Sequence, residues 1–492
     1  MRATSSAAAG RTALDPLLLG IDVGTTFCKA VIVTPDGREV AHARERTPWF
    51  RVAAGQEMGP AAVLATALDV AAAAIQAAPG GPIVAVGVTG LAETGVLLDA
   101  AGRPVVPGIS WFDPRGTEDA AALAAERGAD WFSSHTGLPL GPLPTVFKYR
   151  WLRRNDPSAA RGRRWLNVEE WIVRGLGGDE VAEASLASRT GWLDQSTGGW
   201  WADGLAWADA PADLLPRLVQ AGDLVGRVTP GLLSRADGAA LTVAGHDHLC
   251  VALGVGAMRP GDVLNSCGTT EALIRAVPAS QPVDRILAFV HAGLAIGRHV
   301  VPGEQALMCG SLCGPVLDRF ADLLGVDAAG RAELDAAALA VPSGAGGLTV
   351  RDGAGERATL AGIGQDVTPG LVWRAAHESI QAETRRLLEI LEATVGPTGR
   401  LVAAGGGIRD PLIRSIKGEI VGPFEAPPVG EAGARGAALL SGCAAGIFPD
   451  VHHLPPPGSA APAWLGLPPD GHPGALADLR EATGTAPSRH AP

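Results

Sequence analysis

A glycine and two threonines follow an apolar run near the start of the chain and could bind phosphate. The run and this turn occupy Leu18–Thr26, and a second apolar run, Phe27–Val33, comes directly after them. The pattern predicts a β-hairpin with glycine at its turn. Glycine lets the backbone approach a ligand closely, and threonine hydroxyls and amides donate to phosphate oxygens, so we expect phosphate contacts from Gly24, Thr25 and Thr26. Asp22, at the end of the first strand, is placed to hold a hydrated magnesium ion.

The same pattern recurs about half a chain later. Val263–Ile274 again reads as an apolar strand, a Gly-Thr-Thr turn and a second apolar strand, the turn residues being Gly268, Thr269 and Thr270. Two copies, each heading a long α/β segment, indicate a duplicated pair of domains. Two phosphate-binding hairpins that face each other across a cleft are typical of the actin-like ATPase and sugar-kinase superfamily.

A single acid, Asp247, stands where a strand meets an apolar helical run in Val243–Gly254. A carboxylate at such a junction could accept the proton of a substrate hydroxyl that attacks a phosphoryl group. Two other interpretations stay open. Asp247 could be a helix N-cap, or His246, Asp247 and His248 could form a metal site, although adjacent residues in regular structure do not all point at one ion.

Two further stretches have residue types suited to ligand binding. Ala403–Pro411 reads as a strand, the turn Gly405-Gly406-Gly407 and a helix start. An adenine and ribose could lie flat there with helix amides near phosphate, although triple glycine is also a common loop.

Strand ends in the first half bring together acids, which could accept hydrogen bonds from the hydroxyls of a polyol, and an aromatic ring, on which its carbon face could stack. The alternative is a set of exposed loop charges. These residues are Glu93, Trp111, Asp113 and Arg115.

The elements that position these residues alternate between strand and helix, which predicts a mixed α/β sheet. We expect strands near 38–44, 83–89, 96–103 and 401–404. Helices are expected over 60–77, 305–324, 369–393, 411–421 and 431–446, and loops with short helices over 192–207. Cys309 and Cys313, four residues apart, could then share one helix face as small core residues.

Composition limits the class of protein. With 492 residues, of which 47% are hydrophobic and 18% charged, the chain is expected to form two domains of about 200–250 residues. The net charge of −11 argues against nucleic acid or an anionic membrane as the main partner. No window resembles a membrane span, residues 1–16 read as a disordered leader rather than a secretory signal, and 451–492 as a Pro/Ala-rich tail. Six cysteines without paired spacing indicate reduced thiols in a cytoplasm.

Lysine is rare in this chain. Only three of the 40 basic residues are lysine, and the rest are arginine. Codon bias in a GC-rich genome explains this ratio, so the abundance of arginine has no functional meaning. The lysines that remain are more suggestive for that reason, and they are Lys29, Lys148 and Lys417.

The motifs together resemble the FGGY family of carbohydrate kinases over about residues 17–447. They agree in order: the first hairpin, Trp111-x-Asp113-x-Arg115, Gly245-His-Asp247 with the second hairpin, and the glycine turn followed by Glu431–Ala438. Pro144–Asn155 resembles the first family signature, with Lys148, Trp151 and Asn155 in place, but Leu143 departs from its expected small or aromatic residue. The second signature, near 361–377, is poorly kept at Leu371 and His377.

The resemblance implies two ribonuclease H-like domains, 17–243 and 244–450, with a cleft between them. It implies ATP and Mg²⁺ as cofactors, with Asp247 as general base and metal ligand and Asp22 as a ligand through water. Gly405, Gly406 and Glu431 would line the adenosine pocket. The sugar would contact Glu93, Trp111, Asp113 and Asp247. We expect a small sugar or polyol as partner, with no nucleic acid and no membrane, and the sequence leaves a homodimer open.

Position 93 bears on the substrate. Glycerol kinases of the family are expected to have Arg-Glu at the positions of Ala92-Glu93, and xylulose kinases Met-His. This chain has neither pair, and the missing arginine removes a fork of donors, which favours a ketose, such as the pentulose xylulose, or a longer polyol. Three rival functions remain: a sugar-responsive regulator without turnover, an ATPase whose output is conformational, and a metal hydrolase built on His246 and His248.

Overall fold

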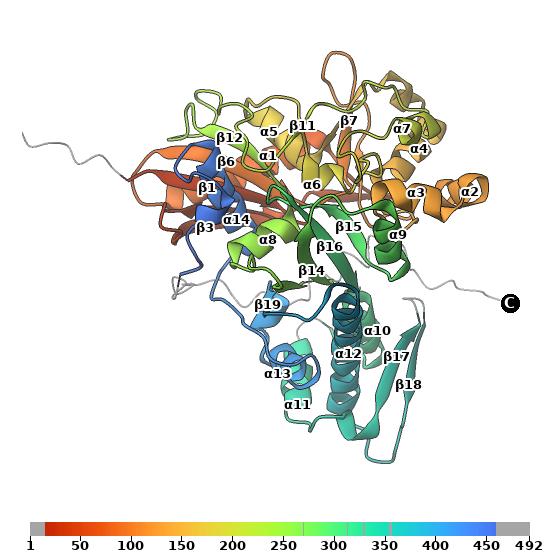
Figure 1. The fold of residues 1–492 in the computed structure, drawn as a ribbon. Coiled ribbons are helices and arrows are strands. Elements are labelled where there is room, and N and C mark those ends of the chain that lie inside the picture. Colours follow the sequence, from red (N-terminus) through yellow and green to blue (C-terminus); the bar gives the residue numbers. More distant parts are fainter. Residues whose placement is uncertain (1–14, 269, 312, 328–329, 354–356, 459–492) are drawn as a thin grey trace, which may run out of the picture.

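Two five-stranded sheets form the centres of two α/β halves of the molecule (Figure 1). The computed structural model describes residues 15–268, 270–311, 313–327, 330–353 and 357–458. Strand order is β12-β6-β1-β2-β3 in the first sheet and β15-β16-β14-β13-β19 in the second. In each sheet an antiparallel hairpin, β1–β2 or β13–β14, pairs in parallel with a later strand, β6 or β19. The predicted α/β fold with a duplicated hairpin is therefore confirmed.

The first sheet consists of β1 (Leu17–Val23), β2 (Phe27–Val33), β3 (Glu39–Arg46), β6 (Ile83–Gly90) and β12 (Ala240–His246). The second consists of β13 (Val263–Cys267), β14 (Glu271–Pro278), β15 (Ala295–Arg298), β16 (Glu304–Ser311) and β19 (Leu401–Ala404). The shorter strands are β4 (Trp49–Val52), β5 (Gly55–Met58), β7 (Gly95–Leu98), β8 (Gly108–Ile109), β9 (Arg164–Asn167), β10 (Ala182–Glu183), β11 (Leu218–Val219), β17 (Thr349–Gly353) and β18 (Arg357–Ala361).

Helices cover both sheets. In the first half they are α1 (Pro60–Ala77), α2 (Thr117–Arg127), α3 (Ala129–Thr136), α4 (Thr145–Asn155), α5 (Val168–Leu176), α6 (Ala184–Ala187) and α7 (Ala202–Trp207). The later ones are α8 (Asp247–Gly254), α9 (Val283–His291), α10 (Cys313–Leu323), α11 (Arg331–Leu339), α12 (Pro369–Val395), α13 (Pro411–Ile420) and α14 (Ala432–Ala444). Figure 1 shows α10 and α12 beside the β17–β18 hairpin, away from the first sheet.

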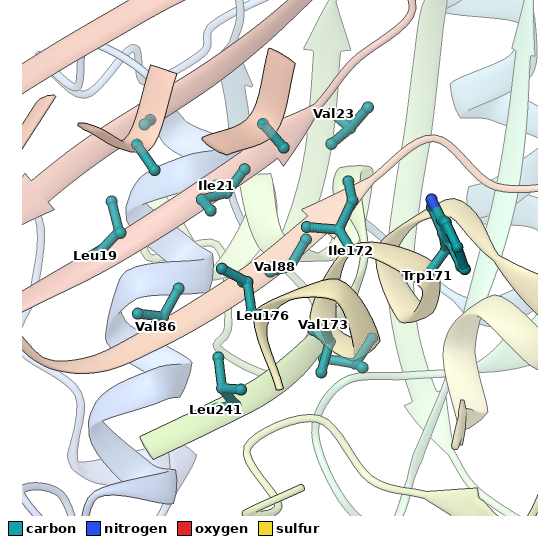
Figure 2. Packing of buried hydrophobic residues seen from close by; sticks show 14 of the residues in the cluster. Leu19, Ile21, Val23, Val86, Val88, Trp171, Ile172, Val173, Leu176 and Leu241 are labelled. Atoms are coloured by element: carbon teal, nitrogen blue, oxygen red, sulfur yellow. The ribbon is translucent and has the colours of Figure 1, made fainter. Parts of the chain in front are cut away.

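Strand β1 is buried on both faces, and its alternate residues pack against different helices. Leu19, Ile21 and Val23 join a core that includes residues of α1 and α5 (Figure 2). Leu18 joins a second core with residues of α8 and α14. A strand in the middle of such a sheet reads as a continuous apolar run, which is why β1 could be recognised in the sequence.

Helix α14 comes from the far end of the sequence and packs on the first sheet. A Cβ on Gly20 of β1 would lie 1.8 Å from the backbone oxygen of Ala434, and one on Gly87 of β6 would lie 2.1 Å from that of Ala437. Two strands therefore carry glycine where the helix backbone approaches them most closely. The contact fixes the start of α14, with Glu431, beside the first hairpin.

The expected helix over 305–324 is wrong in its first half. Residues Glu304–Ser311 form strand β16, which pairs with β14 and β15, and the helix begins only at Cys313. Cys309 is therefore in a strand and cannot share a helix face with Cys313. A short apolar run such as Ala306–Cys309 does not distinguish strand from helix by periodicity, and pairing with two neighbours decides the outcome. The other predicted helices form within a few residues of their expected ends.

Several expectations about the ends of the chain fall wholly or largely outside the described residues. The leader 1–16 is described only from Asp15, and the tail 451–492 only to residue 458, where the carbonyl of Pro456 accepts a hydrogen bond from Arg435. The domain boundary at 243/244 stays a prediction; strand β12, which crosses it, belongs to the first sheet. One described helix, α1, is long and apolar enough to cross a membrane, and its apolar side packs against β2 and β3.

Candidate active site

The first Gly-Thr-Thr turn is held in place by its own hairpin bond and by side chains from two other segments. The amide of Gly24 donates to the carbonyl of Phe27 at 3.1 Å, which closes the hairpin. Trp49 Nε1 donates to the carbonyl of Thr25 at 2.6 Å. Trp111 Nε1 donates to Thr25 Oγ1 at 2.9 Å, so the aromatic residue expected at the sugar is bonded to the turn expected at the phosphate.

Asp22 and Asp247 come together from two different strand ends. Asp22 is buried, and its Oδ1 accepts no hydrogen bond from any described residue. Burial raises the pKa of Asp22 to about 7, partly opposed by the Lys29 ammonium and reinforced by the charge of Asp247. Burial likewise raises the pKa of Asp247 to about 7, although a hydrogen bond from the amide of His248 opposes the shift. These two neighbouring acids resist ionisation, and a bound cation would stabilise their ionised carboxylates.

A third acid, Glu169, lies within electrostatic reach of this pair and was not found by sequence reasoning. It sits in the first turn of α5, is fully buried, and neither carboxylate oxygen has a hydrogen-bond partner among the described residues. Burial, together with the charges of neighbouring acids that include Asp247, raises its pKa well above the usual value. The signal available in the sequence was a pair of acids in the first turn of a mostly apolar helix. Acidic residues are also common in the first turn of helices that have no functional role.

The donor set around Asp22 fits a hydrated magnesium ion. Asp22 and Asp247 supply carboxylate oxygens, which magnesium prefers, and the unpartnered Asp22 Oδ1 provides an unused ligand atom. A Cβ on Gly433 would lie 2.7 Å from Asp22 Oδ2, so glycine at that position leaves the carboxylate its space. Asp22 and Asp247 are therefore the residues that would hold the ion.

Glu431 forms an ion pair with Lys29, one of the three lysines. The Lys29 Nζ to Glu431 Oε2 distance is 2.9 Å, and both side chains are largely buried. Arg409, just after the glycine turn, donates to the carbonyl of Gly430. The segment Gly430–Glu431 thus connects the first hairpin with the glycine turn, and the expected contact of Glu431 with adenosine stays a prediction.

The second hairpin lies beside the triple-glycine turn because β13 and β19 are parallel neighbours. The amide of Gly268 donates to the carbonyl of Thr270 at 3.0 Å; Thr269 lies outside the described residues. Gly405 has a φ of +110°, and a Cβ there would lie 2.4 Å from the carbonyl oxygen of Cys267. Glycine is therefore required at position 405, because the backbone φ is positive and because a Cβ would clash with the Cys267 carbonyl. Gly406 has no such neighbour.

A pocket lies between this hairpin and helices α10 and α12. Its lining residues include Cys267, Gly268, Cys313, His377 and Gly407.

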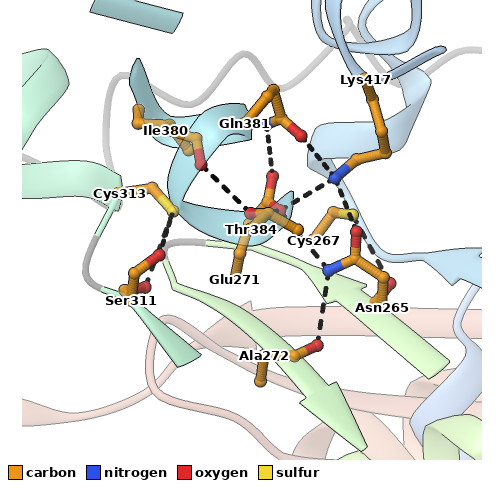
Figure 3. Close-up of polar contacts among 10 residues, drawn as sticks. All are labelled: Asn265, Cys267, Glu271, Ala272, Ser311, Cys313, Ile380, Gln381, Thr384 and Lys417. Carbon is orange, nitrogen blue, oxygen red and sulfur yellow. Dashed lines mark hydrogen bonds and ion pairs between the residues drawn. The ribbon is translucent and has the colours of Figure 1, made fainter. Parts of the chain in front are cut away.

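Lys417 anchors the second hairpin from inside the protein (Figure 3). Its Nζ donates to Asn265 Oδ1 at 2.6 Å, Glu271 Oε2 at 2.9 Å and Gln381 Oε1 at 2.7 Å. Thr384 Oγ1 also donates to Glu271 at 2.8 Å. The network joins β13, β14, α12 and α13, so the only ammonium in it satisfies three acceptors from three different elements.

Asp113 is occupied by a structural network. Its two carboxylate oxygens accept hydrogen bonds from the Arg115 guanidinium at 2.8 and 2.9 Å, and one also accepts from the amide of Gln56 at 2.8 Å. Arg115 also pairs with Glu57 at 2.6 Å. Asp113 is 3% exposed, so in this structure it supports the segment that carries Trp111, and its expected contact with sugar stays a prediction.

Glu93 reaches the neighbourhood of Asp247, where its charge contributes to the raised pKa of that acid. Its Oε1 is 2.6 Å from Arg189 Nη2. Arg189 was not found by sequence reasoning, because nothing in the motifs connects it with position 93. Lys148, the third lysine, donates to the carbonyls of Pro142 and Leu143 at 2.8 and 2.7 Å, and burial lowers its pKa to about 8.

His246, Asp247 and His248 do converge, contrary to the sequence argument against it. Their potential ligand atoms all lie within 4.8 Å of one another, and His246 Nε2 is 3.3 Å from Asp247 Oδ1. The three residues span the junction of β12 and α8, so the geometry of regular structure does not apply. The N-cap position of α8 belongs to His246, and Asp247 Oδ1 accepts from the next amide, His248, at 2.7 Å. Asp247 is therefore not the N-cap.

Comparison with models of protein families identifies the family of this chain. The model of the N-terminal domain of the FGGY family of carbohydrate kinases matches residues 17–254, and that of the C-terminal domain matches residues 263–445. The chain belongs to the FGGY family of carbohydrate kinases. As a member of this family it is a phosphotransferase with an alcohol group as acceptor, and the resemblance seen in the sequence is confirmed.

Curated FGGY relatives carry two different substrate names. The chain is 30% identical over 460 residues to a glycerol kinase of Nitratidesulfovibrio vulgaris (strain DP4), an alignment that covers 88% of this chain and 90% of the relative. It is 29% identical over 445 residues to a xylulose kinase of Streptomyces coelicolor, with coverages of 87% and 89%. Similarity of this degree to both groups assigns the FGGY family without assigning a substrate.

Solved structures of FGGY kinases have the same fold. The xylulose kinase of Rhodospirillum rubrum is 28% identical and superposes with a TM-score of 0.75, covering 86% of this chain and 89% of that one. The glycerol kinase of Plasmodium falciparum, solved with ADP, has a TM-score of 0.78 at 18% identity over 90% and 93% of the two chains. The expectation of two ribonuclease H-like domains is confirmed by these likenesses.

Proposed function

We propose that this FGGY kinase transfers the γ-phosphoryl group of ATP to a hydroxyl of a ketose or polyol. The observation that carries the proposal is the position of Asp247, which lies at the end of β12, beside Asp22 and within the electrostatic reach of Glu93. One acid thus adjoins both the first phosphate hairpin and the expected sugar site. The glycerol kinase structure solved with ADP supports ATP as the donor.

In the proposed reaction Asp247 orients the attacking hydroxyl and accepts its proton as the phosphorus–oxygen bond forms. Phosphoryl transfer passes through a loose transition state, so positioning and charge neutralisation provide most of the acceleration. The turns at Gly24-Thr25-Thr26 and Gly268-Thr269-Thr270 hold the phosphates. A magnesium ion held by Asp22 and Asp247 would neutralise charge on the phosphates.

The adenosine is proposed to lie on the turn Gly405-Gly406-Gly407, in the pocket next to the second hairpin. The open space beside Gly406, and Gly268 and Gly407 in the lining of the neighbouring pocket, support this placement, because bare backbone there leaves room for a flat base and ribose. Glu431 is proposed to border this site from the side of the first hairpin. Trp111, bonded to Thr25, would place the sugar close to the γ-phosphate.

A substrate panel tests the proposal directly. ADP release is measured with ATP and Mg²⁺ across ketoses, polyols and sugar acids, and we expect a signal that depends on one or a few neutral compounds. Steady ADP release without any sugar would instead indicate a conformational ATPase. Nucleotide binding with no turnover on any compound would indicate a regulator. Zinc or another transition metal bound in stoichiometric amount after purification would favour the hydrolase built on the His246–Asp247–His248 cluster.

Magnesium is expected to stabilise the folded protein more at pH 8 than at pH 5. The pKa values of Asp22 and Asp247 are raised from 3.8 to about 7, so between about pH 4 and 7 the folded chain binds more protons than the unfolded chain. Stability contributed by these groups therefore falls as the pH rises through that window. Because magnesium binds the ionised carboxylates, its stabilising effect grows as they ionise.

The measurement is the unfolding temperature with and without magnesium chloride at pH 5 and pH 8, with ADP present in every sample. Asp22→Asn is the control variant, because it removes one ligand charge, and its gain from magnesium should be smaller at pH 8. Equal gains at both pH values, or a full gain in Asp22→Asn, would contradict the assignment of Asp22 as a metal ligand.

A further inference from the structure

The peptide unit that lies just before Asp247 is held at both of its polar atoms by buried hydroxyl groups. Thr89 Oγ1, near the end of β6, donates to the carbonyl of Gly245 at 2.6 Å. The amide of His246 donates to Ser185 Oγ, on α6, at 3.0 Å. Gly245 and His246 share this peptide unit, and both hydroxyl residues are fully buried. Side chains from two different elements therefore fix the plane of one peptide.

Glu183 fixes the direction of the Ser185 hydroxyl. The hydroxyl has a single hydrogen, which it donates to Glu183 Oε2 at 2.6 Å, so its lone pairs remain to accept from the amide of His246. Glu183 is fully buried, and its own amide donates to Glu170 Oε1 at 3.0 Å. Glu183 also caps α6 by accepting from the amides of Ser185 and Leu186 at 2.9 and 3.1 Å. Capping does not need the hydroxyl, so the bond from Ser185 to the next element is a second role.

Strand β12 is irregular at the same point. Its pairing with β6 shifts register between Val243 and Gly245, and Gly245 has a φ of +98°. A bulge of this kind disrupts the ladder locally and re-aims the side chains beside it. A Cβ on Gly245 would lie 2.6 Å from Ser185 Oγ, so glycine allows the hydroxyl to come close. Regular strand pairing therefore does not determine the direction of Asp247, and the two hydroxyls provide that constraint.

We propose that Thr89 and Ser185 are positioning residues of the kinase reaction, which aim the Asp247 carboxylate at the attacking hydroxyl by fixing the Gly245–His246 peptide. Both act through the backbone. The inference rests on the proposed role of Asp247 as general base and deepens it. Because a small displacement of a catalytic group can cost about 100-fold in rate, loss of either hydroxyl should appear in kcat. KM for ATP should change little, since both Gly-Thr-Thr turns lie on other strands.

Thr89→Val and Ser185→Ala remove the two hydroxyls one at a time. Valine has nearly the shape of threonine, so Thr89→Val removes the donor with little change in volume. In each variant we expect kcat for a substrate identified by the panel to fall about 10- to 100-fold, with KM for ATP and for the sugar within about twofold of the wild type. Thr89→Ser and Ser185→Thr retain a hydroxyl, and they should keep kcat within about threefold.

A double-mutant cycle with Asp247→Asn separates positioning from general damage to the site. If the hydroxyls act only through Asp247, adding Thr89→Val or Ser185→Ala to Asp247→Asn lowers the single-turnover rate by less than about twofold, whereas independent effects multiply. Ser133→Ala is the matched control, because the Ser133 hydroxyl is also buried in the first half and donates to the carbonyl of Leu138 at 2.8 Å. Its kcat should stay close to that of the wild type. Thermal unfolding reports whether each variant is folded.

The outcomes distinguish this inference from the proposed function. Folded Thr89→Val and Ser185→Ala enzymes with the kcat of Ser133→Ala would overturn the inference and leave the kinase function standing. Full multiplication of the effects with that of Asp247→Asn, or losses confined to KM, would do the same. If Ser185→Ala does not fold, Thr89→Val decides alone. An Asp247→Asn enzyme with nearly full turnover would overturn the general base and this inference together, and a wild type that phosphorylates no compound of the panel would overturn the kinase function as well.

Discussion

Replacing Asp247 with asparagine is expected to lower kcat by about 10²- to 10⁴-fold, the usual contribution of a positioned general base. The amide keeps the size of the side chain and its ability to accept the hydrogen bond from the amide of His248, but it cannot take up the proton of a substrate hydroxyl. Affinity for ADP measured without magnesium should stay nearly unchanged, because the phosphates are held by the two Gly-Thr-Thr turns. Single-turnover phosphoryl transfer and ADP titration measure the two quantities separately.

Asp410→Asn is a matched control for this experiment. Asp410 caps helix α13 by accepting from the amide of Leu412 at 2.8 Å, and asparagine caps a helix about as well as aspartate. If Asp247 only shaped the start of α8, the two substitutions would have equally small effects. An Asp247→Asn enzyme that retains a tenth or more of its turnover would contradict the role of general base.

Replacing Lys417 with methionine is expected to destabilise the protein by about 3–5 kcal/mol, which is typical when one partner of a buried ion pair is removed. Lys417 is fully buried and Glu271 nearly so, and the substitution leaves the Glu271 carboxylate without its cation. Adding Glu271→Gln to the Lys417→Met variant should recover a large part of this loss, because the buried charge is then gone as well. Urea unfolding of the wild type, both single variants and the double variant measures the free energies.

An exposed ion pair provides the comparison. Arg386 and Glu383 on α12 are 2.6 Å apart but 57% and 39% exposed, and Arg386→Met should cost less than about 1 kcal/mol. If Lys417→Met cost no more than this surface substitution, the network in Figure 3 would not hold the second hairpin in the way described.

Sequence reasoning found the parts of the fold that depend on local pattern. Strand β1 is apolar on both faces, and the two hairpins carry the same turn residues, so both could be recognised without any tertiary information. Strand β16 could not, since its short apolar run fits a helix equally well until β14 and β15 lie on either side of it. The starts of α12 and α13 were found because a proline marks each of them.

The candidate site was predictable where one motif supplied one residue and unpredictable where two distant segments had to meet. Asp22 lies near the end of one recognisable strand, and Asp247 directly follows another. Arg189 meets Glu93, and Lys417 meets Glu271, only through folding over many intervening residues. The rarity of lysine was the one available signal: all three lysines are largely buried and hold parts of the site together.

The packing of α14 on the first sheet has a consequence for the synthesis of this protein. Strand β1 is synthesised long before α14, the helix that covers its Gly20 face. At ordinary translation rates the delay is on the order of tens of seconds. Until Ala434 is made, this apolar face lacks its covering helix, so the first half cannot complete its core until the second half has been synthesised.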